Sequence, residues 1–90
     1  MVKTMRSKTV EFKLYAPSAK CVSLAGNFNN WDTGSIKAKK GIKGSWMIKK
    51  SLKPGRYEYK FFVDGNWVND PSSSNIANSF GTQNSIIEVK

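Results

Sequence analysis

The chain has 90 residues and a formal net charge of +9 at pH 7, because 15 Lys and Arg residues stand against 6 Asp and Glu residues. An apolar share of 39% and a charged share of 23% suit one folded domain and exclude a disordered chain. Histidine is absent and Cys21 is the single cysteine, which excludes disulfide frameworks, Cys/His zinc sites and histidine-activated nucleophiles. No apolar run is long enough for a membrane span or a signal peptide.

Alternating apolar and polar residues predict short strands throughout the chain, and no helical period runs for three turns. The predicted strands cover residues 10–15, 21–25, 45–49, 56–63, 66–68 and 85–89. Within the second of them, Cys21 is predicted to be a small core residue. The pattern indicates an all-β sandwich of about seven strands, with residues 9–90 as the domain and residues 1–8 as a flexible basic lead-in.

Three segments fall outside these strands. Residues 27–34 are polar apart from two aromatic side chains, and residues 37–44 form a basic hairpin end with glycines. Residues 69–84 are long, rich in Ser and Asn, and begin with Asp70-Pro71, which is typical of a turn. Long ordered loops in small domains often serve a function, so this last segment is a candidate part of a site.

A block without acidic residues lies between Asp32 and Glu58. It can bind nucleic acid, anionic lipid or a phosphorylated ligand, or it can be a solvated surface whose lysines protect strand edges. The second interpretation is favoured, and nucleic acid is disfavoured, because arginine is scarce. The basic residues of the block are Lys37, Lys39, Lys40, Lys43, Lys49, Lys50, Lys53 and Arg56.

Asp64-Gly65 between two β-type runs predicts a two-residue hairpin, since a type I′ turn needs positive φ at both central residues. The resulting register places Phe62 opposite Trp67 and Lys60 opposite Asn69. Directly opposed residues share a face of the sheet. The predicted core face holds Tyr57, Tyr59, Phe61, Val63 and Val68. The outward face holds Glu58, Lys60, Phe62 and Trp67.

Trp31 and Trp67 both lie off the predicted core pattern, among Asn, Thr, Ser and Lys residues. Aromatic planes stack on the flat C–H faces of sugars, while amides, hydroxyls and lysines bond the sugar hydroxyls. Nucleic-acid bases stack on aromatic side chains as well. A third interpretation is that a loop covers Trp67 and makes a second, minor core. The high Asn content and the scarcity of arginine favour hydroxyl recognition.

Four segments carry a resemblance to a known family: VSLAGNFNNW (residues 22–31), YEYKFFVDGNW (57–67), DP (70–71) and GTQNSIIEV (81–89). They occur in the order and spacing of carbohydrate-binding module family 48, and the chain resembles in particular the glycogen-binding domain of the AMP-activated protein kinase β subunit. The resemblance implies an immunoglobulin-like β-sandwich and an α-1,4-linked glucan ligand such as glycogen, starch or a maltodextrin. It also implies a catalytic domain or kinase subunit as a possible partner.

By position in these motifs, the resemblance implies a set of carbohydrate-binding residues. Trp31 and Trp67 correspond to the stacking platforms, and Lys60 to the lysine that bonds sugar hydroxyls. Thr82 and Asn84 match the polar pair of the C-terminal loop. Where kinase β subunits carry a leucine that projects into the curve of the glucan, this chain has Phe80, which changes the size of that apolar contact.

We expect a binding domain and not an enzyme, without cofactor or metal. Glycoside hydrolysis needs two carboxylates about 5–9.5 Å apart across a cleft. Here Asp32 is expected to be the only acid close to the site, while Glu58 is expected to face solvent as an ordinary strand residue. The alternative function is a structural docking domain of a larger glucan-active enzyme or kinase complex. Because no disulfide is needed, we expect a reducing, cytoplasmic compartment.

Overall fold

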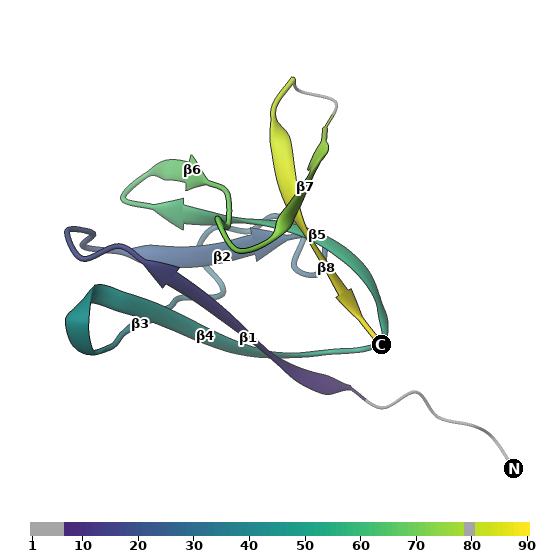
Figure 1. Cartoon of the computed structure of the whole chain (residues 1–90), viewed down its shortest axis with the longest axis horizontal. Coiled ribbons are helices and arrows are strands. Elements are labelled where there is room, and N and C mark those ends of the chain that lie inside the picture. Colours follow the sequence, from purple (N-terminus) through teal and green to yellow (C-terminus); the bar gives the residue numbers. More distant parts are fainter. Residues whose placement is uncertain (1–6, 79–80) are drawn as a thin grey trace, which may run out of the picture.

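The computed structural model describes residues 7–78 and 81–90, and every strand pair in them is antiparallel. The strands form one sheet of order β1-β4-β3 and a second sheet of order β2-β5-β8-β7, in which β6 also pairs with β5 (Figure 1). No helix in the described part of the chain is long and apolar enough to cross a membrane. The elements are β1 (Lys8–Tyr15), β2 (Val22–Gly26), β3 (Lys39–Lys40), the 3-10 turn η1 (Ile42–Gly44), β4 (Ser45–Leu52), β5 (Gly55–Val63), β6 (Asn66–Val68), β7 (Ser74–Ala77) and β8 (Gln83–Val89).

The predicted all-β sandwich is confirmed, with differences in two loops. Strand β7 lies inside the segment predicted as one long loop, and the short β3 lies inside the predicted basic hairpin end. The four residues of β7 include a single large apolar side chain, so their alternation is too weak to signal a strand. Strand β7 forms because the outer edge of β8 supplies its backbone hydrogen bonds.

The core lies between the two sheets, where their inward-facing side chains meet. Phe12 of β1 packs edge-on against Tyr59 of β5, with ring centroids 4.9 Å apart. Trp46 is buried and donates its indole N–H to the Ala16 carbonyl at 2.9 Å, so its polar atom is satisfied. The predicted core face of β5 is confirmed, since Tyr59 and Phe61 are buried and the other members pack against the core.

Cys21 is exposed and precedes β2, so the prediction of a core cysteine was wrong. Its backbone, not its side chain, makes the structural contacts. The Cys21 N–H donates to the Asp64 carboxylate at 2.8 Å, and the Asp64 N–H donates to the Cys21 carbonyl at 3.0 Å. This reciprocal pair ties the start of β2 to the β5–β6 turn and leaves the thiol outside the core.

The β5–β6 hairpin has the predicted register, with Phe62 opposite Trp67. Asp64 and Gly65 have φ of 48° and 85°, the positive values that a type I′ turn requires. The pairing expected between Lys60 and Asn69 is absent, because β6 ends one residue earlier.

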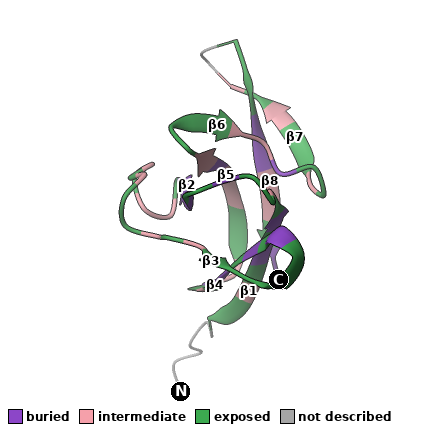
Figure 2. Cartoon of the chain, turned by 90° about the vertical axis from the view of Figure 1, so that its left-hand side faces the viewer, coloured by how far each residue is buried: buried purple, intermediate pink, exposed green. Residues whose placement is uncertain are grey.

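Strand β5 changes its partner along one edge, and this change creates the space for a site. Tyr59 pairs with Ser85 of β8, whereas Phe61 pairs with Val68 of β6. Because β2 occupies the opposite edge of the same stretch, β8 and β6 lie along one edge, on either side of Lys60. Beyond Ser85, β8 pairs with β7 alone, and this hairpin projects away from the sheets (Figure 1). Among the described residues near its tip, Ala77, Gly81, Thr82 and Gln83 are exposed and Asn78 is partly buried (Figure 2).

Gly26 at the end of β2 is required by close packing. A Cβ added there would lie 2.5 Å from the Glu58 carbonyl oxygen and 2.7 Å from the Phe28 ring. We therefore expect Gly26→Ala to lower the free energy of unfolding by about 2 kcal/mol or more, measured by urea denaturation. Gly34→Ala is the matched control, because the nearest atom to its added Cβ is the Asp32 carboxylate at 3.5 Å. Equal stability of the two variants would contradict the packing argument.

Candidate functional site

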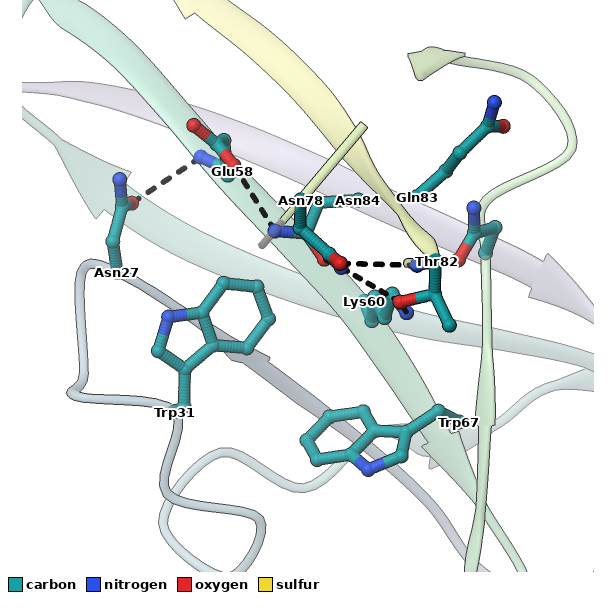
Figure 3. A pocket seen from close by; sticks show the side chains of 10 residues that line it. Asn27, Trp31, Glu58, Lys60, Trp67, Asn78, Thr82, Gln83 and Asn84 are labelled. Carbon is teal, nitrogen blue, oxygen red and sulfur yellow. Dashed lines mark hydrogen bonds between the residues drawn. The ribbon is translucent and has the colours of Figure 1, made fainter. Parts of the chain in front are cut away.

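An open cavity of about 1050 Å³ lies on the outer face of the second sheet, below the projecting β7–β8 hairpin. Strand β5 contributes Glu58 and Lys60 to it, the β2–β3 connection contributes Trp31, and β6 contributes Trp67. Figure 3 shows the two indoles on one side of the cavity and a line of hydrogen-bonding side chains on the other. The cavity therefore combines an apolar wall with a polar one.

Trp31 is held in place by a compact turn after β2. Its backbone N–H donates to the Gly26 carbonyl at 2.9 Å, and the Asn29 side chain accepts from the Gly26 N–H at 3.0 Å. The Asn29 amide also donates to the Asp32 carbonyl at 3.0 Å, which closes the turn. Asn30 and Trp31 both have left-handed backbone, with φ of 57° and 59°. A bulky residue in that conformation costs about 1–2 kcal/mol, which the surrounding hydrogen bonds must offset.

Trp67 remains 47% exposed, so no loop of the described chain covers it and the alternative of a second core is excluded. Its ring packs against the Phe62 ring, with centroids 4.9 Å apart, and Phe62 is only partly buried. The hairpin register places these two side chains directly opposite each other on the outward face. Phe62 thus supports the indole from one side and leaves the rest of the ring open to the cavity.

The two indoles form a bent aromatic surface. The ring centroids of Trp31 and Trp67 are 6.2 Å apart, and the ring planes are inclined by 75°. Two planes at this angle cannot both lie flat against a straight, ribbon-like ligand. They fit a ligand that turns between one ring and the next.

The polar wall is a continuous row of hydrogen-bonded side chains from strands β5 and β8 and the β7–β8 turn, which we call the polar row. Asn84 donates to Glu58 at 3.0 Å and accepts from Asn78 at 3.0 Å. Asn78 and Lys60 both donate to the Thr82 hydroxyl oxygen, at 2.7 and 3.2 Å. The polar row therefore consists of Glu58, Asn84, Asn78, Thr82 and Lys60, and Figure 3 shows these bonds as dashed lines.

Asp70 anchors the chain below the site. It is buried, accepts from the Tyr59 hydroxyl at 2.6 Å and accepts from the Ser72 N–H at 2.8 Å. Its own backbone N–H donates to the Ser85 hydroxyl at 2.8 Å. Burial, and next the hydrogen bond to Asp70, raise the pKa of the Tyr59 hydroxyl well above its ordinary value. The raised pKa therefore extends the pH range over which Tyr59 keeps its proton and the bond beyond that of an ordinary tyrosine.

The structure brings together the residues that sequence reasoning selected. Trp31, Lys60, Trp67, Thr82 and Asn84 all line the one cavity, and Phe80 lies outside the described residues. Sequence reasoning missed further polar residues of the cavity. These are Asn27, Glu58, Asn69, Asn78 and Gln83.

The prediction that Asp32 is the only acid near the site was wrong. Asp32 accepts from the Gly34 N–H at 2.8 Å within its own turn and does not line the cavity. Glu58 does line it and is the single carboxylate among the described lining residues. The alternation of side chains along β5 places Glu58 on the same outward face as Lys60. That alternation could have predicted Glu58 as a residue of the cavity. Across the described ranges, no group of three or more His, Cys, Asp or Glu residues could hold a metal ion.

A small β-sandwich with two partly exposed indoles beside a row of hydrogen-bonding side chains defines a class, the carbohydrate-binding modules. Comparison with protein families agrees, because residues 9–90 match the model of the glycogen recognition site of AMP-activated protein kinase. The chain belongs to this family.

Curated relatives and a solved structure support the same assignment. The chain is 38% identical over 76 residues to 5'-AMP-activated protein kinase subunit beta-2 of Mus musculus, a match that covers 84% of this chain and 27% of that subunit. It is 39% identical over 69 residues to subunit beta-1 of Rattus norvegicus, covering 77% of this chain and 24% of that one. It thus spans about a quarter of the length of these relatives. The structure is similar to a maltogenic amylase from S. marinus, with a TM-score of 0.71 and 25% identity over 97% of this chain and 15% of the amylase.

Proposed function

We propose that this chain binds α-1,4-linked glucan such as glycogen, starch or a maltodextrin without acting on it. One observation carries the proposal: the two indoles, inclined by 75°, share a cavity with the polar row. α-1,4 linkages make a glucan curve, so successive glucose rings can meet planes of different orientation. Trp31 and Trp67 stack on these rings, and Lys60, Thr82 and Asn84 bond their hydroxyls. The family of the glycogen recognition site supports this choice of ligand.

The proposed role is binding alone, because the described residues that line the cavity include no pair of carboxylates. Glycosidases place two carboxyl groups on opposite sides of the scissile bond. Glu58 is the only acid that lines the cavity among the described residues, and its Oε1 already accepts from Asn84. The curated relatives described above are kinase subunits, so we further propose that the chain acts in the cytoplasm as one part of a larger protein. There it holds a kinase partner at a glucan surface.

Titration of the protein with maltoheptaose tests the proposal. We expect saturable changes in tryptophan fluorescence and in the backbone amide signals of Trp31, Lys60, Trp67 and Asn84. The favourable free energy of stacking sugar rings on the two indoles is partly offset by the free-energy cost of association. The difference corresponds to a Kd between ~1 μM and ~1 mM. Cellohexaose, in which the same sugar is joined by β-1,4 linkages into a straight chain, is the matched control and should bind much more weakly. A flat maltoheptaose titration on a folded sample would reject the proposal and favour a docking domain.

A further inference from the structure

The hydrogen bonds of the polar row have a direction that the chemistry of its members dictates. An ionised carboxylate only accepts, so Asn84 must turn its amide nitrogen toward Glu58, 3.0 Å away. The Asn84 carbonyl oxygen then faces the Asn78 nitrogen, also at 3.0 Å. At the other end of the Asn78 amide, the oxygen accepts from the Thr82 backbone N–H at 3.1 Å. The side-chain amides of Asn84 and Asn78 are therefore both fixed in orientation. The Glu58 carboxylate can only accept from the first, and the Thr82 backbone N–H can only donate to the second.

The same direction decides what the Thr82 hydroxyl can do. Its oxygen lies 2.7 Å from the Asn78 nitrogen and 3.2 Å from the Lys60 ammonium, and both of these groups donate only. A hydroxyl oxygen that accepts two bonds has both lone pairs in use, so its own hydrogen must donate to something else. Thr82 is exposed and lines the cavity. Its hydrogen is consequently available to a bound ligand.

We infer that Asn78 is a positioning residue that sets the hydrogen-bonding polarity of the cavity. It directs its two amide hydrogens to Thr82 and Asn84 and so keeps none for the ligand. Through these bonds it holds Thr82 as a donor and Asn84 in one orientation. The inference rests on the proposed glucan site and adds to it a specificity that follows from the described residues.

The resulting cavity has a donor end and an acceptor end. Lys60 and Thr82 present N–H and O–H groups to a ligand oxygen, while Glu58 accepts from a ligand hydroxyl. Figure 3 shows Lys60 with Thr82 toward one end of the row and Glu58 toward the other. A neutral glucose ring matches this polarity, because each of its neighbouring hydroxyls can both donate and accept.

Asn78→Asp tests the inference with a nearly isosteric change. The new carboxylate still accepts from the Thr82 N–H, so the local turn is preserved, but an acceptor replaces the donor that faced Thr82 and Asn84. The Thr82 hydroxyl then donates to that carboxylate and is withdrawn from the ligand. We expect the Kd for maltoheptaose to rise about tenfold or more, by calorimetric or fluorescence titration. The chain should stay folded by circular dichroism, with a lower thermal midpoint of unfolding because the Asn84 carbonyl loses its donor.

Asn75→Asp is the matched control, because it makes the same charge change in the same hairpin outside the cavity. Asn75 accepts from the Ser85 hydroxyl at 3.4 Å through its side-chain oxygen, which aspartate retains. We expect this variant to bind maltoheptaose with the affinity of the unmodified chain. Loss of binding in Asn75→Asp equal to that in Asn78→Asp would show a general charge effect and overturn the inference.

A double-mutant cycle with Thr82→Val separates positioning from a general structural role. If Asn78 acts through the Thr82 hydroxyl, Asn78→Asp weakens binding much less in the Thr82→Val background than in the unmodified chain. An equal loss in both backgrounds, or unchanged affinity of Asn78→Asp alone, would overturn the positioning role. If the unmodified chain binds no maltoheptaose, the proposed function itself fails, and the two failures are thereby distinguished.

Discussion

Replacing Trp67 with alanine is expected to weaken maltoheptaose binding at least about 50-fold while leaving the sandwich folded. Stacking a sugar ring on the exposed part of this indole removes roughly 100–200 Å² of apolar surface from water, worth about 2.5–5 kcal/mol. The ring is 47% exposed and contributes to the cavity wall, not to the core between the sheets. Titration calorimetry measures the affinity, and circular dichroism with a thermal melt measures the fold.

Tyr15→Ala is the control for removing an exposed aromatic ring. Tyr15 is 70% exposed and lies on β1 in the other sheet, away from the cavity. We expect Tyr15→Ala to bind maltoheptaose as the unmodified chain does. If Trp67→Ala keeps its affinity, or if it unfolds at room temperature, the indole is not a stacking platform.

The second indole allows a variant that removes the ring and relaxes the backbone together. Trp31→Gly removes the stacking surface, and glycine adopts the left-handed conformation seen there, with φ of 59°, without steric cost. Binding should be lost as in Trp67→Ala, and stability should be retained.

Replacing Asp70 with alanine is expected to have the largest effect on stability, lowering the free energy of unfolding by about 3 kcal/mol. The change leaves the buried Tyr59 hydroxyl and the Ser72 N–H without their partner, 2.6 and 2.8 Å away in the native chain. An unsatisfied buried polar group costs about 1–3 kcal/mol. Urea denaturation at pH 7 gives the measurement.

Tyr59→Phe completes a cycle that isolates the bond between the two side chains. In the Tyr59→Phe background there is no hydroxyl to lose its acceptor. Asp70→Ala should therefore lower the free energy of unfolding less there than in the unmodified chain. The pKa of Tyr59 is raised in the folded state. The folding stability that its protonated hydroxyl contributes is therefore fully present below the pKa of an unfolded tyrosine, about 10, and this stability is lost as the pH rises above that value. Additive losses in the cycle would show that the bond contributes nothing of its own.

Much of the candidate site could be predicted because its signals are local. Asp64-Gly65 determined the hairpin, and the hairpin determined that Phe62 faces Trp67 and that Lys60 lies on the outward face. Trp31 could be selected as a site residue because it lies in a polar turn, outside any alternating strand pattern that would place it in the core. By contrast, Asp70 was expected only as a turn former, and its buried bond to Tyr59 spans 11 residues. Nothing adjacent to Asp70 in the sequence indicates that contact.

The sequence by itself determined the strands with strong alternation, the tight turn and the presence of two indoles outside the core. These features depend on neighbouring residues, whose periodicity and backbone preferences can be read in order. The tertiary structure alone decided that β8 leaves β5 beside Lys60, and that Glu58, Asn78, Asn84 and Thr82 join Lys60 in one polar row. Asn84 and Glu58 are separated by 26 residues, and Thr82 and Lys60 by 22. Contacts of that separation arise from the packing of whole strands, and the residue types of a single segment do not specify them.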